Sequence, residues 1–118
     1  MVLAYRGTAP GNPIAASSFV ADAVNTTRHV TPVLSVANGR SWVLSIWTHK
    51  DSSTTSMTPP GGVAVRANVS QSGSGLITAL VADSNAAAPA GNVGGLAATA
   101  AAPATNAHMW TIVLAPAP

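Results

Sequence analysis

The side chains best suited to chemistry lie close together in the segment SIWTHKDSSTTSMTPPGG, Ser45 to Gly62. A tryptophan, a histidine, a lysine and an aspartate fall within five residues there: Trp47, His49, Lys50 and Asp51. Successive side chains of a strand alternate between its faces, so His49 and Asp51 share one face with Trp47 and could form a hydrogen-bonded pair. This cluster is therefore the candidate contact for a ligand or a partner.

Catalysis and metal binding both need more than this pair. The chain has no G-x-S-x-G elbow, and with three acidic residues it has few groups whose pKa a fold could tune. His29, His49 and His108 are far apart in sequence and form no H-x-H or H-E-x-x-H pattern. We therefore predict a protein that is not an enzyme and that carries no metal and no cofactor.

Sugar binding is the remaining chemistry for the cluster. Many β-sandwiches bind glycans through an exposed aromatic ring with polar neighbours, and Trp47 with His49 and Asp51 has that composition if its face is wet. The alternative is that a second layer or a neighbouring subunit covers Trp47, as is usual for tryptophan. The phase of the strand places Trp42 and Ile46 on the opposite face, which we expect to be the core.

Composition excludes several classes of protein. Only 7% of the 118 residues are charged, whereas soluble proteins have about 25%. The five cations are scattered and form no basic patch, so nucleic acid is not an expected partner. Hydrophobic residues make up 47% of the chain, which argues against disorder, but no apolar run approaches the roughly 20 residues of a membrane span.

Short apolar segments bounded by glycine and proline predict an all-β fold. The expected strands are Val2–Tyr5, Ser18–Val24, His29–Val36, Ser41–Thr48, Val63–Ser70, Leu76–Ala82, Val93–Ala100 and His108–Leu114. Asn38-Gly39 predicts a tight hairpin and Ser70–Gly75 a longer hairpin loop. The alanine-rich segment Ala97–Ala107 is expected to be an edge strand and loop. We predict one domain, residues 1–118, forming an antiparallel β-sandwich of jelly-roll or immunoglobulin-like type with about eight short strands.

Several motifs, taken in order, carry a resemblance to known proteins: VLAYRGTAP, TTRHVTP, SWVLSIWTHKDSSTTSMTPPGGVAVRA, GSGLITALVADS, PAGNVGGLAATA and MWTIVLAPAP. Together they resemble β-sandwich surface modules found in extracellular proteins of high-GC actinobacteria and in virion proteins of their phages. In those modules a segment like VLAYRGT follows several earlier strands. The chain thus corresponds either to the C-terminal portion of a longer module or to a shortened version, and a shortened version has an open sheet edge.

The resemblance implies a non-enzymatic structural role on a phage virion surface, as a capsid decoration or minor capsid subunit or in a tail appendage. An open edge invites pairing with another chain, so we expect a homo-oligomer or attachment to virion lattice subunits. The alternative is a carbohydrate-binding or adhesion module of a secreted actinobacterial protein, with a cell-surface glycan as its partner. The N-terminal residues MVLAYRGTAPGNP lack the features of a signal peptide, which favours the virion over secretion.

Overall fold

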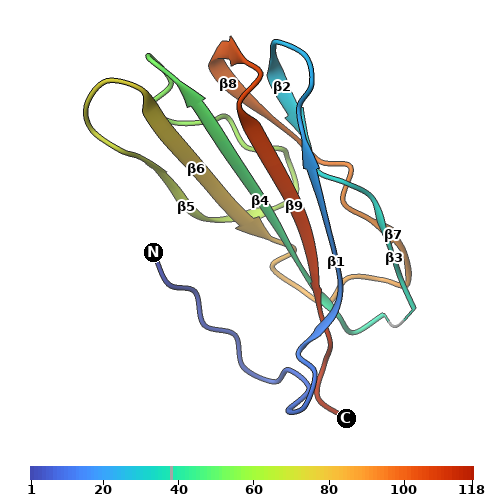
Figure 1. Ribbon diagram of the computed structural model, residues 1–118. Coiled ribbons are helices and arrows are strands. Elements are labelled where there is room, and N and C mark those ends of the chain that lie inside the picture. The colour runs from blue at the N-terminus through green and yellow to red at the C-terminus, as the bar shows by residue number, and fades with distance from the viewer. Residues whose placement is uncertain (38) are drawn as a thin grey trace.

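The computed structural model describes residues 1–37 and 39–118, and within them the chain forms nine β-strands and no helix (Figure 1). The strands are β1 (Ile14–Ala21), β2 (Thr26–Val30), β3 (Leu34–Val36), β4 (Trp42–Asp51), β5 (Ala64–Ser70), β6 (Leu76–Asp83), β7 (Gly91–Val93), β8 (Ala97–Ala104) and β9 (Ala107–Leu114). All strand pairs are antiparallel. The predicted all-β antiparallel fold is confirmed, with nine strands instead of about eight.

The strands form one large sheet and two small ones. The large sheet has the order β1-β9-β4-β6-β5, while β2 pairs with β8 and β3 pairs with β7. Both small sheets lie on the same side of the large sheet, so that the arrangement is sandwich-like (Figure 1). We call the side of the large sheet that faces them the inner face and the other side the outer face.

The inner face holds the core in two clusters. The larger one packs Trp47, Leu80 and Met109 of the large sheet against Ala98 and Ala100 of β8. Alanines at these positions leave room for the indole of Trp47, because large and small side chains interdigitate across facing layers. The smaller cluster joins the large sheet to β3 and β7 through Val36, Val43, Ala88 and Val113.

Two expected strands are each divided in two. The segment His29–Val36 breaks at Pro32, which has no N–H for a ladder, into β2 and β3. The segment Val93–Ala100 breaks at Gly94, whose φ is +86° and whose absent Cβ would lie 2.1 Å from the carbonyl oxygen of Pro32. Only glycine fits such a close approach at positive φ. These breaks separate the two small sheets.

Other expectations have mixed outcomes. The loop Ser70–Gly75 joins the paired strands β5 and β6, as predicted. Residue Asn38 of the predicted tight hairpin lies outside the described residues, but the hairpin is wrong because β3 pairs with β7 and β4 with β6 and β9. Residues Val2–Tyr5 form no strand, whereas the alanine-rich segment does form β8. Within the described ranges no helix is long and apolar enough to cross a membrane.

Candidate functional site

The two faces of β4 are reversed relative to expectation. Trp47 and His49 point to the inner face and are 0% and 1% exposed, while Trp42 and Ile46 lie half-buried on the outer face. The expectation that Trp42 and Ile46 face the core was wrong, because both small sheets cover the other side. The Trp47 indole N–H donates a hydrogen bond to the carbonyl oxygen of His29 at 3.1 Å. Trp47 is therefore covered by the chain's own second layer, which leaves no wet face for a glycan there.

The remaining two residues of the cluster separate at the end of β4. Lys50 is exposed on the outer face, so the four residues do not form one site. Asp51 accepts hydrogen bonds from the backbone N–H groups of Ser53 (2.9 Å) and Thr54 (2.7 Å) and from the hydroxyl of Thr54 (2.5 Å). Burial raises the pKa of Asp51, but these bonds and the one from His49 outweigh it and hold the pKa well below its ordinary value. Asp51 is thus an ionised carboxylate that fixes the start of the loop.

The structure adds two residues that the sequence did not single out, Asp22 and His29. Oδ2 of Asp22 contacts Nδ1 of His29. Nε2 of His29 lies 2.8 Å from Nδ1 of His49, and Nε2 of His49 lies 3.1 Å from Oδ2 of Asp51. We call this continuous line of four side chains the Asp–His–His–Asp network. It ties β2 of the small sheet to β4 of the large one.

The network is closed to contact with a substrate in this conformation. Both histidine side chains are fully buried, whereas Asp22 and Asp51 are 18% and 9% exposed. Across the described part of the chain, no buried side-chain nitrogen or oxygen lacks a hydrogen-bond partner. That described part also contains no group of three or more His, Cys, Asp or Glu side chains arranged to hold a metal ion. The chemistry that this geometry supports is the sharing of protons along the line.

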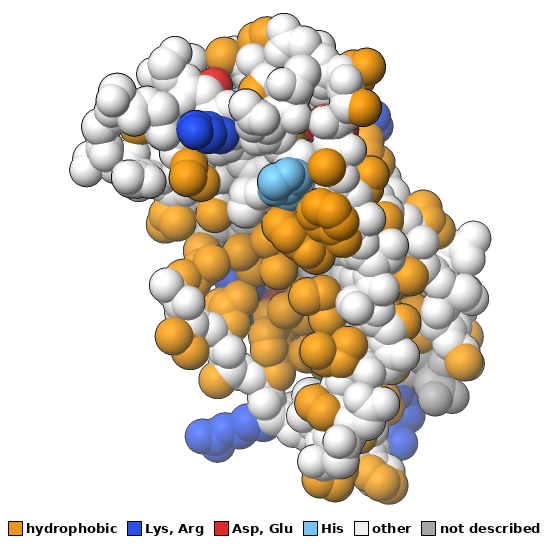
Figure 2. Space-filling view, in the orientation of Figure 1, with side chains coloured by type: hydrophobic (Ala, Val, Ile, Leu, Met, Phe, Trp, Pro, Cys, Tyr) orange, Lys and Arg blue, Asp and Glu red, His pale blue; other side chains and the backbone are white. Residues whose placement is uncertain are grey.

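The outer face of the large sheet is apolar and partly exposed, although Leu44 and Val81 on it are only 8% and 2% exposed. Residues directly opposite each other in neighbouring strands share a face, and one such row crosses all five strands: Phe19, Trp110, Ile46, Val81 and Ala67. Adjacent rows add Val69, Ala79, His108, Ile112 and Leu44. Phe19, Val69 and Ile77 are 52%, 51% and 47% exposed. Figure 2 shows hydrophobic side chains grouped over the middle of this face.

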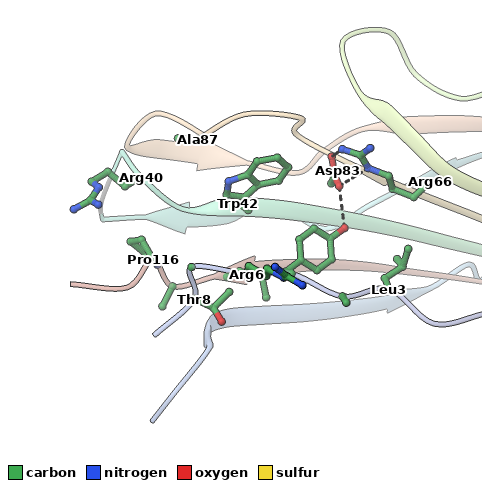
Figure 3. A pocket seen from close by; sticks show the side chains of 14 residues that line it. Leu3, Arg6, Thr8, Arg40, Trp42, Arg66, Asp83, Ala87 and Pro116 are labelled. Atoms are coloured by element: carbon green, nitrogen blue, oxygen red, sulfur yellow. Dashed lines mark hydrogen bonds and ion pairs between the residues drawn. The ribbon is translucent and has the colours of Figure 1, made fainter. Parts of the chain in front are cut away.

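One end of the outer face is covered by the N-terminal segment, residues 1–8. The Tyr5 hydroxyl donates to Asp83 at 2.9 Å, and its ring lies against Trp42 with a centroid separation of 6.2 Å. Asp83 also receives two hydrogen bonds from the Arg66 guanidinium, at 2.7 and 2.9 Å. Figure 3 shows Arg66 and Asp83 at one end of the cleft of about 560 Å³ between this segment and the sheet.

These contacts set the charges in the cleft. Burial and the hydrogen bond to Asp83 raise the pKa of Tyr5 to about 12, so its hydroxyl stays a donor at neutral pH. Burial raises the pKa of Asp83, but its bonds with Arg66, Asn85 and Tyr5 bring it below the ordinary value. The only carboxylate at the described outer face is therefore neutralised by a bound guanidinium.

Comparison with known proteins gives no further assignment, since no family model, no curated protein and no solved structure matches the chain. The outer face and the Asp–His–His–Asp network are therefore the features of the molecule that bear on its function.

Proposed function

We propose that this chain is a non-enzymatic structural protein of a phage virion surface, serving as a capsid decoration or minor capsid subunit or as part of a tail appendage. It attaches through the exposed part of the outer face, and its partners are protein subunits of the same particle, other copies of this chain included. One observation carries the proposal: an apolar row crosses the face, and the side chains of Phe19 in that row and of Val69 and Ile77 beside it are exposed.

The outer face has the size of a specific interface. Its strands are seven to ten residues long. With a spacing of about 4.8 Å between strands and about 3.3 Å per residue, the face measures roughly 20 by 26 Å. Two opposed copies would bury at most on the order of 1,000 Å² in total, because residues 1–8 already cover one end of the face, and this is the lower limit of specific interfaces. Apolar patches of this kind usually mark interaction sites, and many copies on a lattice strengthen a weak contact through avidity.

The β1 edge offers a second contact. Its sequence IAASSFVA has no charged residue and no proline, and among the described strands only β9 pairs with it, which leaves its other edge free. The opposite edge, β5, is interrupted by a bulge between Val65 and Ala67, where Arg66 binds Asp83. An unprotected edge accepts a strand from another chain. We therefore place strand addition, from a second copy or a lattice subunit, at β1.

The fold proposed for this role is a jelly-roll or immunoglobulin-like sandwich with a reduced second layer. In a complete sandwich, two sheets cover one another's inner faces. Here the pairs β2–β8 and β3–β7 take the place of the second sheet. Such an arrangement suits a module completed by a neighbouring subunit.

A carbohydrate-binding or adhesion module is the competing function. The exposed aromatic group on the outer face consists of Phe19, Trp110 and His108. The Phe19 ring is tilted by 43° to Trp110 and by 57° to His108, so the group offers no flat surface for a sugar ring. Trp47 is buried and cannot contact a sugar either, so a protein partner fits this surface better than a glycan does.

The test compares self-association of the wild type with Phe19→Ser and Val33→Ser. Each variant removes one exposed apolar side chain, but Val33, which is 58% exposed, lies between β2 and β3 on the other layer. By sedimentation velocity we expect Phe19→Ser to weaken association about tenfold or more, since burying a Phe side chain is worth about 1.5–3 kcal/mol. Val33→Ser should behave like the wild type.

Two results would contradict the proposal. One is a wild-type protein that stays monomeric at high concentration at every salt concentration and is absent from purified virions by mass spectrometry. The other is a glycan-array signal that disappears in Trp110→Ala, which would support the competing function instead.

A further inference from the structure

The Asp–His–His–Asp network contains one hydrogen atom more than its side chains ordinarily supply. Each of its three junctions joins two heteroatoms at hydrogen-bond distance or closer, so each needs one hydrogen. Two neutral imidazoles bring one N–H each, and an ionised carboxylate brings none. Two hydrogens cannot serve three junctions, and at any junction left empty two lone pairs would face each other inside the protein.

The end of the network at Asp51 cannot supply the missing hydrogen. Both oxygens of Asp51 already accept hydrogen bonds, from the backbone N–H groups of Ser53 and Thr54 and from the Thr54 hydroxyl. Its lowered pKa agrees with a permanent carboxylate. Nε2 of His49 must then donate to Asp51. The extra hydrogen therefore belongs to one of the other two junctions, His29–His49 or Asp22–His29.

We propose that the Asp–His–His–Asp network is a binding site for one proton, which the protein takes up when it folds and which holds β2 against β4. Two arrangements fill all three junctions. In one, the histidine pair is an imidazole–imidazolium pair between two carboxylates. In the other, Asp22 is a carboxylic acid that donates to a neutral His29. Both contain three protons and a net charge of −1, so the proton count is the same for either.

Among the described residues, no other titratable side chain is paired with either histidine in the neighbouring strands. The residues paired with His49 in the flanking strands are Thr78 of β6 and Ala107 of β9, and the residue paired with His29 is Ala98 of β8. The nearest charged or titratable neighbours along the same strands are Arg28, Lys50 and His108, which are exposed because alternation turns them away. Asp22 and Asp51 are therefore the groups that face the histidine pair.

The proton count fixes the sign of the pH dependence. Above about pH 6.5 two histidines of an unfolded chain hold two ring protons, one fewer than the folded network, so stability falls as pH rises. Well below that pH the two histidines of the unfolded chain hold four ring protons, one more than the three protons of the folded network, so stability falls as pH drops. The stability profile has its maximum near pH 6.5. On the alkaline side the unfolding equilibrium constant rises tenfold per pH unit.

The test measures urea unfolding between pH 7 and pH 8.5 for the wild type, Asp22→Asn and His108→Gln. The wild-type unfolding constant should rise about twentyfold over this range, because the unfolded histidines are still partly protonated at pH 7. An asparagine at position 22 brings an N–H of its own to Nδ1 of His29, so all three junctions are filled with two neutral imidazoles and the rise should disappear. His108 is exposed on the outer face, so His108→Gln should keep the wild-type rise.

Three outcomes would overturn the proposal: a wild-type constant that does not change with pH, a rise that survives in Asp22→Asn, or a rise that is lost in His108→Gln. If Asp22→Asn does not fold, proton release by the wild type on unfolding still tests the proposal. Its heat of unfolding at pH 7.5, measured in buffers of different ionisation enthalpy, should report the release of one proton on unfolding. Release of no proton would overturn the proposal as well.

Discussion

Replacement of Trp47 by phenylalanine tests the assignment of the inner face directly. Trp47 is completely buried, and its N–H donates to the carbonyl oxygen of His29. Phenylalanine lacks about three buried ring atoms of the indole, worth about 2 kcal/mol at roughly 0.8 kcal/mol per methylene-sized group. It also leaves the His29 carbonyl without its partner, at about 1 kcal/mol. We expect a loss of about 3 kcal/mol in the free energy of unfolding.

The matched control is Trp42→Phe, which makes the same chemical change on the outer face. Trp42 is only half-buried, so its replacement should cost less than about 1 kcal/mol. Far-ultraviolet circular dichroism should follow urea unfolding, because tryptophan fluorescence changes with the substitutions themselves. At about 2 kcal/mol per molar urea, Trp47→Phe lowers the midpoint by about 1.5 M. Equal midpoints for the two variants, or a larger shift in Trp42→Phe, would refute the assignment.

Three further predictions concern pH and backbone. The folded-state pKa of Tyr5 is raised from 10.0 to about 12, so its contribution to the free energy of unfolding is complete below pH 10 and is lost as pH rises toward 12. Urea midpoints at pH 8 and pH 11 should show this loss of stability in the wild type but not in Tyr5→Phe. The pKa of Asp51 is lowered, so its contribution to the free energy of unfolding is complete above about pH 4 and is lost in more acidic solution. Asp51→Asn should therefore lose less stability than the wild type below pH 4. An equal loss in both proteins would contradict the assigned role of Asp51. Gly94→Ala brings a Cβ against the Pro32 carbonyl at positive φ and should destabilise by about 2 kcal/mol or more in thermal unfolding, whereas Gly61→Ala, in open space, should be near neutral.

Sequence pattern located most strands of this fold but could not orient β4. The strand is apolar on both sides, with Trp42, Leu44 and Ile46 alternating with Val43 and Trp47. Alternation divides such residues into two sets without saying which set a second layer will cover. That choice depends on where β2 and β8 pack, and the breaks at Pro32 and Gly94 that create the small sheets involve contacts between distant segments.

The buried network was beyond reach of sequence pattern for a similar reason. His29 and His49 are twenty positions apart and belong to strands of different sheets, so their contact exists only once the layers are packed. One signal was available. The chain has three acidic residues, and the structure places each of them against a basic side chain: Asp22 with His29, Asp51 with His49 and Asp83 with Arg66. Strand alternation did predict the His49–Asp51 contact, which forms one end of the network, but it gave no sign of the contact with His29.

The use of all three carboxylates in these pairs explains the character of the surface. Two of them are spent on the Asp–His–His–Asp network and the third on Arg66, so the described outer face presents no free negative charge. Lys50 and His108 on that face, and Arg6 of the segment that covers one end of it, are exposed basic groups. In the proposed attachment of two copies through this face, like charges would meet, so apolar burial would be the main source of affinity. Apolar burial is strengthened by salts such as sulfate, whereas exposed ion pairs are screened by salt. In the proposed role, the ionic interactions stay within the molecule and the apolar outer face binds the partner.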